Sequence, residues 1–88
     1  MQTFESTAVT VTICKNGLFH SQYGSKLVTF VRYKKVQTID FYDTSRYITL
    51  MDKDGDTILS IPRNDFDDFE GLFHGILAKW TAFWSGQV

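Results

Sequence analysis

The chain has 88 residues, which is enough for one hydrophobic core and too few for two, so we expect a single domain. Its net charge of −1 argues against a general affinity for nucleic acid. The single cysteine, Cys14, cannot form an internal disulfide, and no leader sequence or apolar run of about 20 residues is seen. We therefore expect a cytoplasmic location and no membrane span.

The charged residues divide the chain into a basic and an acidic stretch. Residues 15–35 carry five lysines and arginines and no acid, whereas residues 52–70 carry seven acids and two cations. We therefore expect the folded domain to have a basic and an acidic side. Such a division serves either solubility or the docking of a partner.

The first strong strand signal lies at residues 7–14. Val9, Val11 and Ile13 alternate with polar residues there, the period of a strand with one buried face. The dipeptide Asn16-Gly17 follows and predicts a tight turn into a second strand at 18–23, because both residues tolerate a positive φ.

Further strands are predicted from runs rich in β-branched and aromatic residues that are separated by turn residues. In chain order they cover 27–33, 36–42, 46–51 and 57–61. The turns between them lie at Gly24-Ser25, at 43–45 and at Lys53-Asp54-Gly55.

One amphipathic helix is predicted after Pro62, which ends the last strand. It should begin near residue 65, with Asn64 or Asp65 as the N-cap, and end before Ser85. Its apolar residues recur every three or four positions and form one stripe: Phe66, Phe69, Leu72, Phe73, Ile76, Leu77, Trp80, Phe83 and Trp84. Gly71 and Gly75 lower helix propensity, which predicts a close approach of the helix to the strands.

The predicted fold class is therefore α+β and mainly β. We expect an antiparallel sheet or partly open barrel of about five or six strands, over residues 7–61, closed by one C-terminal helix at 65–84. The helix residues predicted to lie on the sheet are Phe69, Phe73, Ile76 and Trp80. The sheet face beneath them is predicted to consist of Val9, Val11, Ile13 and either Ile48 or Leu50.

No group of residues has the spacing of a catalytic or metal centre. The acids from Asp52 to Asp56 resemble the start of a calcium loop, but Thr57 stands where that loop requires glycine and Arg63 where it requires glutamate. A hairpin turn is the better interpretation. His20 and His74 have no partner at a zinc-ligand spacing, and Cys14 has no activating signature. We expect no catalytic residues, no metal and no cofactor, and hence no enzyme.

Two surfaces are candidates for binding. The C-terminal aromatic residues Trp80, Phe83 and Trp84 either cap an open end of the sheet or form an exposed interaction surface. The basic strands offer a second candidate, an anion-binding site made of Lys26, Arg32, Lys34, Lys35 and Arg46. The aromatic residues among these cations, Tyr23, Phe30 and Tyr33, are expected to face the core rather than to stack on nucleic acid.

Three segments carry a resemblance to a known family: residues 11–18 (VTICKNGL), 33–39 (YKKVQTI) and 58–66 (ILSIPRNDF). In apolar spacing, turn placement and element order the chain resembles bacterial pleckstrin-homology-like domains. The resemblance implies a curved antiparallel sheet closed by a C-terminal helix, and a scaffold that binds lipid, peptide or protein. It carries over no functional residue.

The leading hypothesis is a non-catalytic protein-interaction module that uses the C-terminal aromatic residues or a free sheet edge, with self-association as one form of it. The alternative is a module that binds an anionic ligand (a lipid head group, a phosphate or a nucleic acid) through the basic strands at residues 26–46. The expected partner is a protein or a second copy of the chain, and nucleic acid is the less favoured partner.

Overall fold

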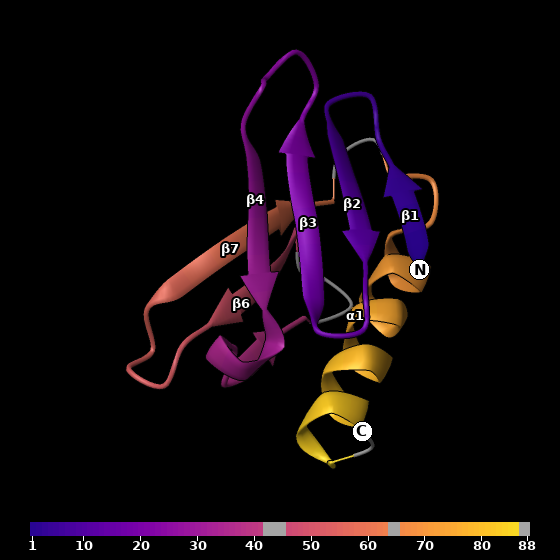
Figure 1. The fold of residues 1–88 in the computed structure, drawn as a ribbon. Helices are drawn as coiled ribbons and strands as arrows, with labels where there is room; N and C mark the ends of the chain where they lie inside the picture. The colour runs from indigo at the N-terminus through magenta and orange to yellow at the C-terminus, as the bar shows by residue number, and fades with distance from the viewer. Residues whose placement is uncertain (42–45, 64–65, 87–88) are drawn as a thin grey trace.

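The computed structural model describes residues 1–41, 46–63 and 66–86 (Figure 1). In these ranges the chain forms strands, one short 3-10 helix and one C-terminal α-helix. The elements are β1 (Gln2–Glu5), β2 (Val9–Ile13), β3 (Gly17–Gln22), β4 (Val28–Arg32), η1 (Tyr33–Lys35), β5 (Thr38–Asp40), β6 (Tyr47–Met51), β7 (Thr57–Pro62) and α1 (Phe69–Trp84). The predicted class, mainly β with one C-terminal helix, is confirmed.

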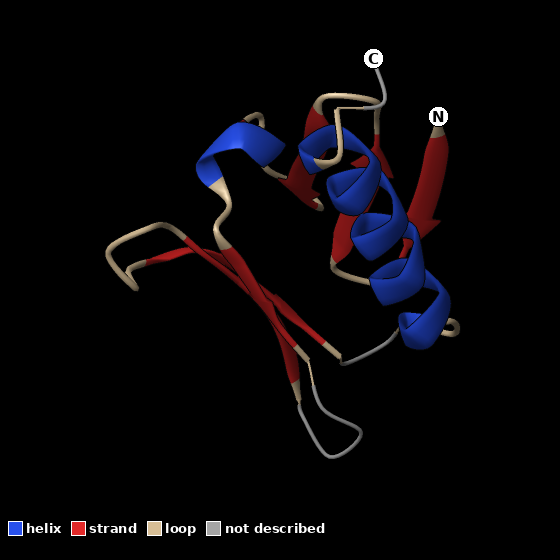
Figure 2. Cartoon of the chain, turned by 90° about the horizontal axis from the view of Figure 1, so that it is seen from below, coloured by secondary structure: helices blue, strands red, loops and turns tan. Residues whose placement is uncertain are grey.

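The strands form two antiparallel sheets that do not close into a barrel. The first has the order β1-β2-β3-β4 and the second the order β5-β6-β7. Figure 2 shows the two sheets at an angle, with α1 lying along the four-stranded sheet. The extra strand relative to the prediction is β1, whose short sequence contains only one apolar residue, Phe4, and becomes a strand by pairing with β2 at Val11.

The turn between β2 and β3 differs from its prediction. The amide of Cys14 donates to the carbonyl of Gly17 at 2.8 Å, so the two loop residues are Lys15 and Asn16. Gly17 is the first residue of β3 and is not among the glycines with positive φ. A Cβ there would lie 2.8 Å from the Phe30 ring, so glycine is needed because β4 passes close by.

The hairpin between β6 and β7 forms as predicted. The amide of Gly55 donates to the carbonyl of Asp52 at 3.1 Å, and Gly55 has φ +83°, a conformation that favours glycine. This is a three-residue loop that ends in a left-handed residue. Pro62 is the last residue of β7, as expected.

The helix begins later than predicted, at Phe69. Asp68 is its N-cap, and the Asp68 carboxylate accepts a hydrogen bond from the amide of Gly71 at 3.0 Å. The predicted caps, Asn64 and Asp65, lie outside the described residues. Gly71 therefore makes room for the capping carboxylate, since a Cβ there would lie 2.6 Å from Cγ of Asp68.

The core lies between the helix and both sheets. Of the helix, Phe69, Leu72 and Ile76 are buried, and Gly75 allows the close approach predicted for it, because a Cβ there would lie 2.9 Å from Cδ1 of Ile13. The Phe41 ring stacks on that of Phe73 at 4.2 Å. The other buried apolar residues of the cluster are Val9, Val11, Ile13, Leu18, Val31, Val36, Ile48, Leu50 and Ile61.

The predicted contact of the helix with the sheets agrees with this cluster. Phe73 and Trp80 pack against it as partly buried residues, and Ile48 and Leu50 both belong to it. Among the described residues, α1 is not long and apolar enough to cross a bilayer, and no other helix is either.

Candidate functional site

The C-terminal aromatic residues lie against the 3-10 helix η1. The Trp80 indole Nε1 donates to the carbonyl of Val36 at 2.8 Å. The Trp84 Nε1 donates to the carbonyls of Tyr33 and Val36 at 3.1 and 3.2 Å. The Tyr33 carbonyl also accepts a hydrogen bond from the amide of Val36, the residue that follows η1, at 3.0 Å. The two indoles therefore supply additional donors to the carbonyls at the start of η1 and directly after it. The Phe83 ring lies 6.1 Å from that of Tyr33, so all three residues have contacts within the chain.

Trp84 is nevertheless half exposed, at 50%. It forms one wall of a groove of about 410 Å³ beside η1. The rest of the lining is polar and carries both signs of charge: Lys34, Lys35, Gln37, Asp52, Lys53 and Asp54. Lys53 was not among the predicted anion-binding residues, because in the sequence it stands in the acidic stretch. The two aspartates in the lining reduce the attraction of this groove for an anion.

The five predicted anion-binding cations do not converge on one site. Lys34 and Lys35 belong to η1, directly after Arg32 at the end of β4. Lys26 precedes β4. It lies six positions from Arg32, which corresponds to about 20 Å in an extended chain. Arg46 lies at the start of β6, whereas the end of β6 is the part that pairs with β5 next to η1. The structure therefore groups Arg32, Lys34 and Lys35 and separates the other two.

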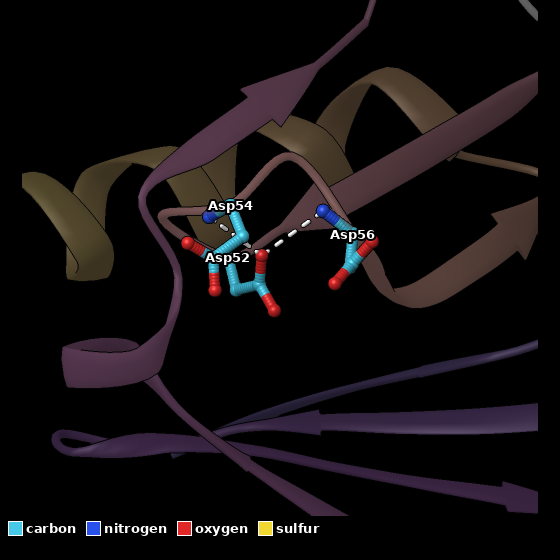
Figure 3. Close-up of side chains that lie close together, drawn as sticks. All are labelled: Asp52, Asp54 and Asp56. Atoms are coloured by element: carbon cyan, nitrogen blue, oxygen red, sulfur yellow. Dashed lines mark hydrogen bonds between the residues drawn. The ribbon is translucent and has the colours of Figure 1, made fainter.

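The acidic turn between β6 and β7 brings three carboxylates together (Figure 3). Ligand atoms of Asp52, Asp54 and Asp56 lie within 4.8 Å of one another. The Asp52 carboxylate accepts hydrogen bonds from the amides of Asp54 and Asp56, both at 2.9 Å. Asp52 thus stabilises the predicted hairpin turn, a role that accounts for this carboxylate without an ion.

A surface that the sequence did not predict lies on the outer face of the four-stranded sheet, where Phe19 of β3 stands directly opposite Phe30 of β4. Their ring centroids are 4.6 Å apart, while their side chains remain 42% and 38% exposed. The guanidinium of Arg32 lies 5.7 Å from the Phe30 ring centre. The Arg32 cation supports this Phe19–Phe30 pair, and no other element among the described residues covers it.

The register explains why these rings face outward. The amide of Tyr33 donates to the carbonyl of Asn16, which makes that pair a hydrogen-bonded one. Pairs alternate along an antiparallel ladder, so Phe19 and Phe30 form a non-hydrogen-bonded pair, in which side chains come closer. By the same alternation, the amides and carbonyls of Val28, Phe30 and Arg32 point away from β3.

These outward-pointing groups form the β4 edge, defined here as the main-chain groups of Val28, Phe30 and Arg32. Figure 1 shows β4 at the border of the four-stranded sheet. Among the described residues, no hydrogen bond pairs this edge with another strand. The side chains of these three residues are also exposed, Val28 to 58%.

The other sheet edges carry more of the features that discourage strand addition than β4 does, whose one charged residue is Arg32 at its end. The outer strand β5 has three residues and contains Asp40, β7 ends in Pro62, and β1 has four residues and contains Glu5. Short edges, charged side chains and proline hinder the pairing of a further strand. The sequence of β4, VTFVR, has five residues with neither proline nor an acid.

A groove of about 270 Å³ lies on the inner side of β4, where the two sheets diverge. It is lined by Leu27 and Thr29, by Leu59 of β7, and by the polar residues His20, Gln22 and Ser25. Burial lowers the pKa of His20, which favours the neutral imidazole at this position. Leu27 is 81% exposed, so apolar surface is present on both sides of β4.

The expected inward orientation of Tyr23, Phe30 and Tyr33 is correct only for Tyr33. Tyr33 is buried, whereas Tyr23 is 88% exposed and Phe30 lies on the outer face. A signal for Phe30 was present in the sequence: Arg32 must face water, and residues two positions apart in a strand share a face. Val28 and Phe30 therefore share the solvent side with Arg32.

Comparison of the chain with protein-family models, with curated proteins and with solved structures found no match. The candidate site is accordingly defined by its geometry: the β4 edge, the Phe19–Phe30 pair on one side of it and the groove beside Leu27 and Thr29 on the other.

Proposed function

We propose that this domain is a non-catalytic interaction module that binds an extended segment of another protein along the β4 edge. The observation that carries the proposal is the unpaired edge of β4, which has apolar surface on both of its faces. Strand addition uses such an edge, because main-chain hydrogen bonds give affinity and alternate side chains fill neighbouring pockets.

The side-chain surfaces are needed for such binding on energetic grounds. Each intramolecular hydrogen bond contributes about 1 kcal/mol net, and the three residues of the edge supply only a few. Association costs at least about 4 kcal/mol in lost freedom of motion. The Phe19–Phe30 pair and the inner groove supply apolar contacts that add to the main-chain bonds.

The predicted surface at Trp80, Phe83 and Trp84 is a weaker candidate for the same work. Both indole N–H groups already donate to carbonyls of the chain, so a partner gains fewer new contacts there. The alternative, an anionic ligand, has less support because the cations are separated and Asp52 and Asp54 share the lysine groove. The resemblance to pleckstrin-homology-like scaffolds also favours peptide or protein binding over catalysis.

The test uses an uncharged, eight-residue peptide that alternates valine and threonine as the probe for the edge. With isotope-labelled protein, we expect the largest amide chemical-shift changes at residues 28–32. The substitution Val28→Pro removes one outward amide without removing a bond to β3, so it should weaken binding at least about ten-fold while the domain stays folded.

The matched control is Thr3→Pro, which removes an outward amide from the opposite edge strand, β1. This control should bind the peptide as the unsubstituted domain does. If Val28→Pro does not fold, the shift map of the unsubstituted domain still decides: largest changes at β1 or at Trp84 would show that β4 is not the binding edge.

A further inference from the structure

We infer that the β4 edge selects a segment with an apolar centre and acidic residues at both ends. This inference rests on the proposed function and adds the chemistry of the partner to it. It is carried by the cations at the two ends of β4, Lys26 before the strand and Arg32 at its end, with Lys34 and Lys35 beyond.

The electrostatics of the edge are one-sided. Residues 15–35, which form β3, β4 and η1, contain five cations and no acid. Lys26 and Arg32 have no ion-pair partner within the described ranges, and both are exposed. Asp52 and Asp54 lie in the groove with Lys34 and Lys35, so they offset part of the charge of those two lysines. The two cations nearest to an added strand are therefore Lys26 and Arg32.

The spacing of these two cations sets the spacing of the acids. Six positions of extended chain separate them, about 20 Å, so acids about six positions apart in an added strand come opposite them. Between them the outer face is apolar, with Val28 and Phe30, whereas the inner groove combines Leu27 and Leu59 with polar residues. A segment with an apolar centre, most strictly on its outer face, fits this surface.

A second copy of the chain is a poorer fit to the same edge. An antiparallel pairing of two β4 strands that uses the outward groups of both brings Lys26 of one copy close to Arg32 of the other. Like charges placed opposite each other destabilise strand pairs. Nucleic acid is also a poorer fit, because the net charge of the chain is −1 and Asp52 and Asp54 lie beside Lys34 and Lys35.

The test compares three ten-residue peptides that share one apolar centre and differ at both ends, which carry glutamates, glutamines or lysines. Binding is measured by fluorescence anisotropy at about 50 mM and 500 mM salt. We expect the glutamate peptide to bind at least about ten-fold more tightly than the lysine peptide at low salt, and this ratio to shrink at high salt, where charges are screened.

Charge reversal on the protein gives the second arm of the test. The double substitution Lys26→Glu with Arg32→Glu should remove the preference for glutamate ends or invert it. The matched control is Lys79→Glu, the same change at an exposed position on α1, and it should preserve the preference. Neither change removes a main-chain group of the edge, so loss of all three peptides together would contradict the inference.

The outcomes separate this inference from the proposed function. Equal binding of the three peptides that is lost in Val28→Pro would overturn the acidic partner and leave strand addition intact. Binding of the glutamate peptide that Val28→Pro does not weaken would overturn strand addition itself. A dimer in sedimentation that Val28→Pro dissociates, or a twelve-nucleotide oligothymidine that binds as tightly as the glutamate peptide, would show that the edge serves another partner.

Discussion

Two pairs of aromatic residues in this domain have opposite surroundings. Trp80 and Trp84, at the end of α1, lie against η1 and donate hydrogen bonds to the carbonyls of Tyr33, in η1, and of Val36, directly after it. Phe19 and Phe30 lie on the outer face of the sheet, touch each other, and are covered by no other element that the structure describes. For Trp80 and Trp84 the sequence left capping and exposure open, and both indoles are docked, although Trp84 stays half exposed. Phe30, which was expected in the core, is on the surface.

The difference follows from the polar group that each ring carries. An indole has one N–H donor and is stabilised where a carbonyl can accept it, as at Tyr33 and Val36 around the short 3-10 helix. A phenylalanine ring has no such group, so its position depends only on which face of the strand it occupies. The aromatic side chains at the end of α1 are thus held by hydrogen bonds and packing, whereas the side chains of the Phe19–Phe30 pair beside the open β4 edge are held by packing and the nearby Arg32.

The largest expected effect is at the end of α1. Trp80→Ala should lower the free energy of unfolding by about 3 kcal/mol, because it removes a large, partly buried side chain and a hydrogen bond. Trp80→Phe should cost about 1 kcal/mol, since it removes mainly the bond to Val36. Urea denaturation measures both. Equal stability of Trp80→Ala and the unsubstituted domain would contradict the docking of the helix end on η1.

A smaller effect is expected at Trp84, which is half exposed. Trp84→Glu should cost about 1 to 2 kcal/mol, because the indole contacts with η1 are lost while the new charge reaches water. The variant should remain folded and should bind peptides at the β4 edge as the unsubstituted domain does. If it lost peptide binding and kept its stability, the aromatic end of α1 would be the interaction surface instead.

Tyr33 connects the helix end to the turn between β2 and β3. Its phenol donates to the carbonyl of Cys14 at 2.7 Å, so Tyr33→Phe should cost about 1 kcal/mol at neutral pH. Burial raises the pKa of this phenol far above its ordinary value of 10.0, and Cys14 adds in the same direction. The unfolded chain therefore loses this proton first, and stability should fall as the pH rises above 10.0.

The alkaline loss of stability should be smaller in Tyr33→Phe, which has no proton to lose at this position. Thermal melts at pH values about one unit apart, from about 9 to 11, measure this loss, and tyrosinate absorbance reports the deprotonation of the phenols. Tyr23, which is exposed, provides the control as Tyr23→Phe. Identical alkaline curves for the two variants would show that the Tyr33 phenol is not held in the protonated form by the fold.

The smallest expected effect on stability is at the open edge. Phe30→Ala should cost less than about 1 kcal/mol, since it removes one cross-strand ring pair that remains partly in water. Its effect on peptide binding should be the larger of the two, because the same ring faces the added strand. A loss of stability as large as that of Trp80→Ala would mean that the Phe19–Phe30 pair is structural.

Much of the fold could be predicted from the sequence, because local chemistry decides the elements. The alternation at Val9, Val11 and Ile13 specified β2 and its buried face, and Asp54-Gly55 specified a turn. The three- and four-residue steps specified α1 and its inward side, apart from its first turn. The N-cap there is Asp68, because the residue at which the helix begins depends on how the helix packs on the sheets and not on the local sequence alone.

Other features depended on pairing across the chain, which no local pattern contains. The strand β1 forms because β2 offers it a free edge. Gly17 is a strand residue because it pairs with β4, which lies too close to leave room for a Cβ. Of the candidate sites, the aromatic residues of the helix end and the cations were visible in the sequence. Their separation into a docked helix end and an open β4 edge was not, because it depends on which carbonyls the tertiary structure brings to the indoles and on which strand lies at the border of the sheet.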